Sequence, residues 1–513
     1  MASNTAPEKQ DERISQTPYA PSQIGEQAPS VMREDDLAFP RAVGTISGAV
    51  VLFGGMALAM NLYGYNRVID TGWSLVVLVL GLAGLLYHSA FDRDIQFRRL
   101  YMTFGLASLL LGVVLAFASF FKGYEQTLPW SIPLLMLGVM FFLCFRRNET
   151  DEKVRDTVQY IVGGAGVTLG LAGLLPAILY ETFFLPTGFV LSIAGLFLLA
   201  AYVGASGTSD DRAYTVSLGT AAGGVLVFLL VLIRSLFTAN GSTFFVGTGF
   251  PMLLVSLGYV LVGLGLALDW PLFVLTRREL AAFFLSPVAY MSLLAFSLFA
   301  WISFLFFVTR FQNRVIPEPV LAIYIIDLFP VFVLIFVVPV LTMRLLSEEQ
   351  RSGTLEVLLT APVDEPVVVL SKFIAGLLTY LIVWLPFALI LLAIPAAGGK
   401  LFDYRPMSSF FIALVATGAM FISMGLFCSS LSSSQISSGV LTFVGMLLLT
   451  FVYFIVNQSG RELSVILRHI SYLHTWSSAL EGRVVLRELL FPLSATVLFL
   501  FMTVKVLESR KWR

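Results

Sequence analysis

A charged segment lies between two long apolar stretches in the second half of the chain. It spans residues 347–362 and reads SEEQRSGTLEVLLTAP. Gly353 is suited to break or bend a helix, because glycine adopts backbone conformations that other residues avoid. Thr354 can then cap a short new helix, with Glu356 near its positive end. Pro362 ends that helix, so the pattern predicts a short helix held beside the membrane.

The apolar side chains of this short helix fall on one face. Leu355, Leu358 and Leu359 are spaced i, i+3 and i+4, which places them side by side. The charged residues that precede them are Glu348, Glu349 and Arg351. A solvated loop does not need three leucines in register, so the pattern favours docking into a groove of another protein. A plain solvated loop remains the alternative.

A second amphipathic segment, residues 276–287, reads TRRELAAFFLSP. It is charged at its start and aromatic afterwards. Such a segment can lie in the headgroup plane of a membrane, or it can extend the preceding span, and its composition leaves both open. Its distinguishing residues are Arg278, Glu279, Phe283, Phe284 and Pro287.

Catalytic chemistry is not indicated anywhere in the chain. No G-x-x-x-x-G-K-[ST] phosphate loop occurs, and the run at 398–400, Gly-Gly-Lys, is followed by Leu401. Any ATP must therefore bind a different chain. His88, His469 and His474 lack the spacing of metal ligands, so structural or solvated roles are expected and no metal site is predicted.

Asp327 is the single carboxylate within a predicted span of the second half. An acid inside the membrane is a candidate for a substrate path, since burying its charge is costly. The competing interpretation is a residue near the interface that reaches water or pairs with a neighbouring helix.

The composition requires a membrane around most of the chain. Of 513 residues, 58% are hydrophobic and 12% are charged, and the mean hydropathy is +0.88. A water-soluble globule cannot hide so much apolar surface, so membrane lipid is an expected partner. The net charge of zero gives no reason to expect nucleic acid. The two cysteines, Cys144 and Cys428, are expected to be core residues.

About fourteen apolar stretches are long enough to cross a bilayer. About 21 of the 32 lysines and arginines fall on the side of the N-terminus, which predicts that both termini are cytoplasmic. Residues 1–40 are polar and predict a disordered cytoplasmic tail. The uncharged run 429–435 predicts a turn, and 458–488 predicts short surface helices. The predicted spans are 42–64, 73–90, 101–121, 129–145, 158–179, 186–204, 214–237, 250–270, 288–308, 321–344, 371–395, 407–429, 437–457 and 489–507.

The first half is repetitive. Gly81, Gly138 and Gly195 recur every 57 residues, and Gly258 follows after 63. We infer four duplicated helical hairpins within residues 41–270. Small residues four apart let helices approach closely, either at a dimer face or inside the bundle. Such pairs are Gly44 with Gly48, Ser108 with Gly112, Gly166 with Gly170, and Gly219 with Gly223. No ionisable residue lies at the centre of these spans, which argues against an ion relay.

The charged segment also resembles a family signature. Residues 348–363, EEQRSGTLEVLLTAPV, look like the EE-x-R-x-G-T-L-E-x-L-L-x-A-P-V signature of ABC-2 type permeases. The segment from Arg278 to Tyr290 resembles the elbow helix and first span of that family. The final residues, LESRKWR, are similar to the closing L-E-x-R-R-W of the subgroup named for gliding motility. The resemblance covers residues 277–513 and all six expected spans.

The resemblance implies a six-helix permease domain, 271–513. The spans and the repeat predict an eight-helix hairpin module, 41–270, before it, so we expect an all-α polytopic membrane protein. It implies the permease subunit of an ATP-driven exporter in a bacterial inner membrane. This chain would be no enzyme and would bind no cofactor, while ATP and Mg²⁺ would bind a partner ATPase. A second permease subunit, identical or not, would complete the transporter. The residues coupling it to the ATPase would be Glu348, Glu349, Arg351, Gly353, Thr354, Leu355, Glu356, Leu358, Leu359 and Pro362.

Two other functions compete with this one. A secondary transporter would need paired intramembrane charges and broken helices, and the sequence is poor in both. A membrane scaffold that recruits proteins would use the repeat module without transport. Neither explains the charged signature at 348–363.

Overall fold

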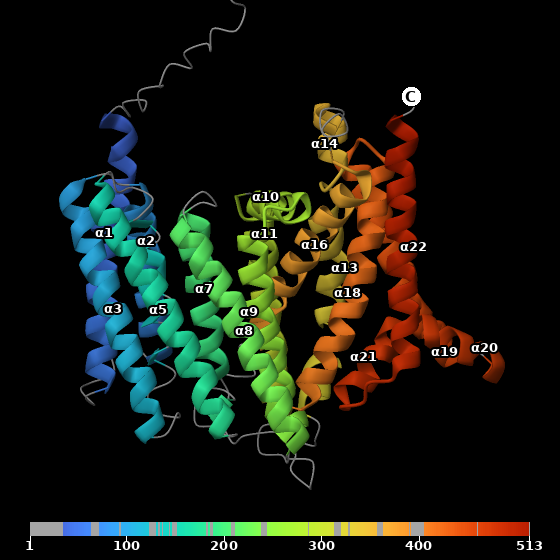
Figure 1. Ribbon diagram of the computed structural model, residues 1–513, viewed down its shortest axis with the longest axis horizontal. Helices are drawn as coiled ribbons and strands as arrows, with labels where there is room; N and C mark the ends of the chain where they lie inside the picture. Colours follow the sequence, from blue (N-terminus) through green and yellow to red (C-terminus); the bar gives the residue numbers. More distant parts are fainter. Residues whose placement is uncertain are drawn as a thin grey trace, which may run out of the picture. The chain divides into compact units, whose positions relative to one another are not determined.

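The computed structural model describes residues 34–511 apart from several gaps, and every regular element in the described part is a helix (Figure 1). The described chain divides into two compact units, Met1–Phe104 with Leu143–Thr150, and Gly105–Phe142 with Asp151–Arg513. The gaps are 63–70, 92–93, 123–129, 132–133, 136, 143, 146–150, 181–182, 185–187, 207–210, 238–243, 286, 312–319, 327–328, 356–362, 389, 391–404 and 459.

Eleven helices in the described part are long and apolar enough to cross a membrane, and two shorter apolar helices accompany them. Each overlaps one of the predicted spans. The predicted span 129–145 is interrupted by gaps and stays a prediction. The expectation of an all-α polytopic membrane protein is confirmed.

The first unit contains α1 (Glu34–Leu62), α2 (Thr71–Phe91) and the beginning of α3 (Ile95–Lys122). Helix α1 starts inside the predicted tail, most of which lies outside the described residues. Helices α1 and α2 pack closely, because a Cβ added at Gly81 would lie 2.8 Å from the backbone nitrogen of Val51. His88 is buried, and its Nδ1 lies 2.7 Å from the hydroxyl of Tyr101. The burial of His88 and its contact with Tyr101 indicate a structural role for this histidine.

The hairpin helices α5 (Glu152–Leu179) and α7 (Phe189–Ser206) pack through glycine. A Cβ added at Gly195 would lie 2.5 Å from the nitrogen of Gly170 and 2.8 Å from the oxygen of Gly166. The pair Gly166 and Gly170 therefore packs inside the bundle. In contrast, a Cβ at Gly219 or Gly223 would meet nothing within 4 Å among the described residues.

In the next hairpin, α8 (Asp211–Phe237) and α9 (Phe250–Ala267), a different glycine makes the close approach. A Cβ added at Gly263 would lie 2.6 Å from the nitrogen of Ala221. A Cβ at Gly258 would meet only the side chain of Leu196, at 3.5 Å. Gly263 therefore makes the close contact of this hairpin, and the place of Gly258 in the repeat stays a prediction.

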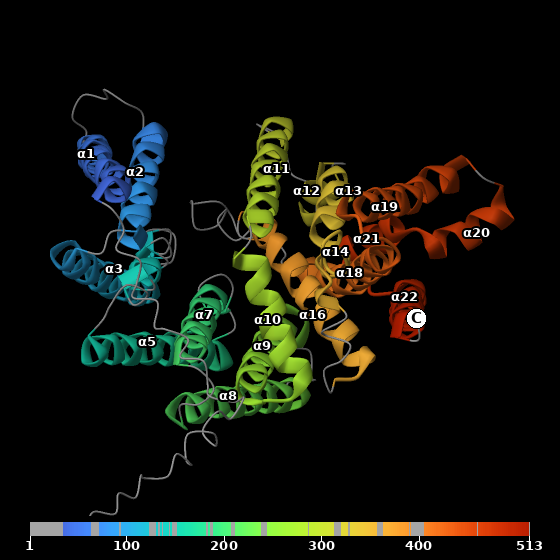
Figure 2. The same cartoon turned by 90° about the horizontal axis from the view of Figure 1, so that it is seen from above.

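Helix α10 (Pro271–Leu285) lies across the end of α11 (Pro287–Phe311), as Figures 1 and 2 show. Helix α9 ends at Ala267, and the backbone of Leu268 is extended (φ −85°, ψ 129°). The chain therefore turns before α10 begins. Of the two alternatives for the amphipathic segment 276–287, the extension of the preceding span is excluded.

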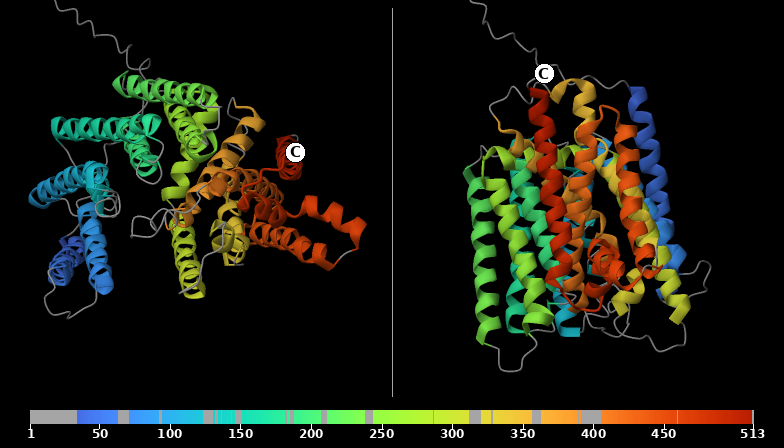
Figure 3. Two further views of the ribbon diagram at one scale, coloured as in Figure 1. Left: turned by 90° about the horizontal axis from the view of Figure 1, so that it is seen from below. Right: turned by 90° about the vertical axis from the view of Figure 1, so that its right-hand side faces the viewer.

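The remaining helices share one large apolar core that includes Phe296, Tyr380, Trp384, Phe387 and Phe421. Helix α18 is mostly buried at its centre, whereas α19 and α22 are mostly exposed along their apolar faces. Helix α22 packs along α18 and returns the chain to the end of the spans where α14 lies (Figure 3). The helices of this core include α12 (Val320–Ile326), α13 (Phe329–Thr342), α16 (Glu365–Val383), α18 (Arg405–Leu431), α19 (Gln435–Gln458) and α22 (Leu486–Lys511), and the short α14 (Ser347–Ser352) follows α13.

Two short helices, α20 (Arg461–Ile470) and α21 (Tyr472–Leu480), lead into α22, as predicted. Helix α21 is not a surface helix. The indole N–H of Trp476 donates to Thr417 Oγ1 at 3.0 Å, and the hydroxyl of Ser409 donates to the carbonyl of Ala479 at 2.6 Å. Burial lowers the pKa of His474, which favours the neutral form that suits a structural role.

The glycine contact between α5 and α7 can be tested with two alanine substitutions. Gly195→Ala should lower the free energy of unfolding by about 1–3 kcal/mol, because its methyl group must displace the backbone of α5. Gly164→Ala, in the same hairpin, should be neutral or stabilising by less than about 1 kcal/mol, because its Cβ meets nothing within 4 Å. Denaturant titrations in detergent measure both, and equal effects would contradict this packing.

Candidate functional site

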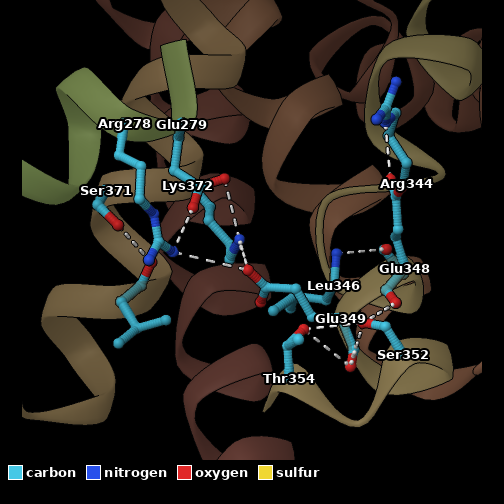
Figure 4. A network of polar contacts seen from close by, with 12 residues as sticks. Arg278, Glu279, Arg344, Leu346, Glu348, Glu349, Ser352, Thr354, Ser371 and Lys372 are labelled. Carbon is cyan, nitrogen blue, oxygen red and sulfur yellow. Dashed lines mark hydrogen bonds and ion pairs between the residues drawn. The ribbon is translucent and has the colours of Figure 1, made fainter. Parts of the chain in front are cut away.

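A buried lysine joins three helices at one end of the spans. The Nζ of Lys372, on α16, lies 3.0 Å from Glu279 Oε2 of α10 and 2.8 Å from Glu349 Oε1 of α14. The lysine side chain is 2% exposed. Figure 4 shows both carboxylates directed at the ammonium group. One charge therefore holds the elbow helix, the charged segment and a span together.

Lys372 reaches this position because α16 begins earlier than predicted. The predicted span, 371–395, has Lys372 as its second residue. In the structure α16 starts at Glu365, preceded by Asp364 as N-cap and with Pro366 in the first turn. These three residues form a helix-start pattern. That pattern was the signal that could have placed Lys372 about two turns from the start of the helix.

Arg278 completes the cluster from the solvent side. Its Nη2 lies 3.0 Å from Glu279 Oε1 and 3.8 Å from Glu349 Oε1. Two carboxylates thus face two cations. Because Arg278 is more than half exposed, water screens its ion pairs and they contribute little to stability. The ion pairs of the buried Lys372 contribute most to the stability of the cluster. Without its partners, Lys372 would be an unpaired charge removed from water, which is strongly destabilising.

The last turn of α18 holds α14 in place. The backbone N–H groups of Leu346 and Ser347 both donate to Ser429 Oγ at 3.0 Å. The side-chain amide of Gln350 donates to the carbonyl of Ser430 at 3.0 Å, and Arg510 of α22 donates to the same carbonyl at 2.9 Å. Ser429 and Ser430 belong to α18, and not to the predicted turn 429–435. Nothing in their sequence context pointed to this function.

Gly353 ends α14 in the left-handed conformation, with φ at +72°. The predicted break is confirmed, because only glycine adopts this conformation without strain. The hydroxyl of Thr354 lies 2.8 Å from Ser352 Oγ and 3.5 Å from the carbonyl of Glu349. These contacts run back to α14. Residues 351–354 are exposed, and we call them the tip.

The cluster has the charged groups needed for electrostatic recognition. Among the described residues there is no group of histidine, cysteine and acidic side chains that could hold a metal ion. A hollow of about 710 Å³ opens among Arg278, Arg344, Glu348, Glu349 and Lys372. Arg344 Nε lies 2.9 Å from Glu348 Oε2. The result is a charged hollow beside an exposed tip.

Comparison with known proteins gives one match. Residues 317–473 match the family model described as ABC-2 family transporter protein. This segment is similar to the ABC-2 transporter family, and we call residues 317–473 the ABC-2 domain. No curated protein and no solved structure matches the chain. The apolar helices of the described part and this match together support a multi-pass membrane protein that contains a transporter-like segment. The narrower resemblance to the gliding-motility subgroup stays a prediction.

The ABC-2 match contains the tip, Glu349 and Lys372, while the elbow residue Glu279 precedes it. Of the predicted elbow residues, Arg278 and Glu279 lie in the cluster, and Phe283 is buried in the core. Phe284 is part of α10 and Pro287 begins α11, and both side chains lie outside the described residues. Asp327 also lies outside them, so its predicted role in a substrate path stays a prediction.

The ABC-2 domain buries a leucine that was expected to face a partner. Leu355 is 4% exposed and belongs to the same core as Leu345 and Leu346. Its side chain therefore anchors the tip to this chain instead of presenting an apolar face outward. The other coupling residues of the predicted short helix, Glu356, Leu358, Leu359 and Pro362, lie outside the described residues.

Replacement of the buried lysine tests how much the ion-pair cluster contributes to the free energy of unfolding. Lys372→Met should lower the free energy of unfolding by about 3 kcal/mol or more, because it leaves two carboxylates facing each other in a mostly buried site. Lys505→Met is the matched control. Lys505 is 55% exposed and pairs with Glu508 on the surface, so its loss should cost less than about 1 kcal/mol.

A second substitution separates charge repulsion from lost packing. In the double variant Glu349→Gln with Lys372→Met, one of the facing negative charges is gone, so part of the lost stability should return. Denaturant titration in detergent gives all four free energies of the cycle. A Lys372→Met variant as stable as Lys505→Met would show that the cluster does not hold the three helices together.

Proposed function

We propose that this chain is the permease subunit of an ATP-driven ABC exporter and that the tip receives force from a separate ATPase subunit. The observation that carries the proposal is the anchoring of the tip. Residues 351–354 are exposed, yet the helix just before them is tied to α10 and α16 through Glu349 and Lys372. A contact made at the tip therefore acts on several helices at once.

The physical step is a difference in affinity between two states. An ATPase that binds the tip more tightly in one arrangement of the spans shifts the population toward that arrangement. Ser429 and Ser430 connect the same helix to α18 and α22. Displacement of the tip then moves the buried α18, which packs against most of the core helices. A flexible loop at this place would absorb the force instead.

The proposal includes the remaining parts of the transporter. ATP and Mg²⁺ bind the ATPase subunit, because this sequence has no phosphate loop. A second permease subunit, identical or related, provides the other side of the pathway. The assembly lies in a bacterial inner membrane with the tip and both termini in the cytoplasm, in accord with the bias of lysine and arginine.

Charge reversal at the tip tests the contact with the ATPase. The double variant Arg351→Glu with Thr354→Arg should reduce co-purification of an ATP-binding subunit at least tenfold, because it rearranges the charges that the tip presents at the contact. The control is Arg483→Glu in the exposed loop before α22, where the arginine side chain is 69% exposed. It should leave association unchanged.

The same loss is expected for Glu356→Lys combined with Leu358→Lys, which changes the following part of the predicted coupling segment. Purification of the full chain from its own membranes, followed by measurement of ATP hydrolysis, reads out both experiments. An ATPase that stays bound and active after both sets of changes would refute the proposed coupling.

The orientation can be tested with single cysteines. In a chain with Cys144→Ala and Cys428→Ala, the variant Thr354→Cys should react with a membrane-impermeant maleimide only in inverted vesicles. Arg483→Cys should react only in intact cells or right-side-out vesicles, because its loop lies at the other end of the spans. Labelling of Thr354→Cys from outside the cell would reverse the topology and remove the tip from the reach of ATP.

A further inference from the structure

A narrow apolar groove lies between the hairpin module and the ABC-2 domain. Its volume is about 370 Å³. One wall comes from α7 and α9, and the other from α12, α16 and α18. We propose that this groove binds one acyl chain of a membrane phospholipid. The site is separate from the ion-pair cluster, and it gives α7 and α9 a function beyond packing.

All lining residues lie in the same half of the spans. They occupy the first turns of α7, α9 and α18, which start at the end away from the tip. On α16, which runs the opposite way, they are the last residues and those just after it, from Leu378 to Ala388. Half of a bilayer core is roughly 15 Å thick. The groove therefore faces the chains of one leaflet, the one remote from the tip.

The chemistry of the lining selects an alkyl chain. The walls are aliphatic and aromatic, and Ser408 is the sole hydroxyl-bearing residue among them. Water is a poor occupant, since apolar cavities of this kind stay dry. An irregular peptide is poor too, because its N–H and C=O groups would lack partners. An empty groove would forfeit the dispersion contacts of its walls.

A helix from a second copy is the other apolar occupant that could cover the groove, and the experiment below distinguishes the two. At this depth the surrounding medium is hydrocarbon, so an acyl chain reaches the groove without leaving that medium. Phe197 is 49% exposed beside the groove, so the site is open to such a chain from the lipid.

Gly258 provides a way to close the groove without disturbing the backbone. It is among the lining residues, and a Cβ there would meet only the side chain of Leu196, at 3.5 Å. Gly258→Leu should therefore place its side chain in the space of the ligand. Gly265→Leu is the matched control. It lies on the same face of α9, outside the groove, where a Cβ meets only Phe273 at 3.8 Å.

Photolabelling of the full chain in nanodiscs tests the proposal. The nanodiscs contain phosphatidylethanolamine and phosphatidylglycerol, with a trace of phosphatidylglycerol that carries a diazirine on one acyl chain. Peptides from 189–197, 251–258 and 378–388 should be labelled at least fivefold more than the exposed stretch 298–305 of α11. Gly258→Leu should reduce this labelling at least fivefold, and Gly265→Leu should leave it unchanged.

Labelling spread evenly over all lipid-facing helices, or labelling that Gly258→Leu does not change, would overturn the proposal. A second readout does not depend on the glycine variants. Phe197→p-benzoylphenylalanine, in the otherwise native chain, should form an adduct with the mass of a phospholipid on irradiation. A covalent dimer of the chain at that position would instead identify a second copy as the occupant and refute acyl-chain binding.

Discussion

The arrangement at the end of the spans depends on the burial of a single ammonium group. Lys372 is removed from water, and the cost of that removal is offset only if both carboxylates stay close. This condition fixes the distance between the elbow helix, the first span after the tip and the helix before it. Three elements distant in sequence become one mechanical unit. The ABC-2 domain thereby acquires a stiff region next to its most exposed residues.

Hydrogen bonds extend that unit through the ABC-2 domain. The end of a helix leaves carbonyl groups without partners, and α18 uses one of them to bind side chains from α14 and α22. The hydroxyl of Ser429 binds two backbone N–H groups that precede and begin α14. The helix that carries the tip is held by ion pairs on one side and by neutral hydrogen bonds on the other. Salt weakens the exposed pairs of this network and leaves the neutral contacts largely unaffected.

Local sequence patterns predicted the features that depend on near neighbours. The break at Gly353 and the separate short helices before α22 needed only backbone preference and spacing, and both are present. The face of Leu355 was misjudged, because an apolar stripe on a helix looks the same whether it packs against its own chain or another. Helix α21 was placed on the surface for its polar residues, although Tyr472, Trp476 and Leu480 bury one side of it.

The features that were missed depend on contacts over long sequence distances. Lys372 meets Glu279 from another helix, and no periodicity links the two residues. The sequence around Ser429 does not indicate that its hydroxyl accepts from the backbone N–H of Leu346. In the repeat module, counting residues pointed to Gly258, while the close contact of helices selected Gly263. Spacing alone cannot follow a register that shifts between hairpins, because loop length changes without altering the helix pair.

The shared carbonyl of Ser430 connects the last turn of α22 to the helix that carries the tip. Its oxygen has two lone pairs, so it accepts from Gln350 and from Arg510 at the same time. The positive charge of Arg510 draws electron density toward its own hydrogen bond, and Gln350 donates to the same oxygen. A change of charge in the last turn of α22 therefore alters the acceptor used by the residue beside Glu349.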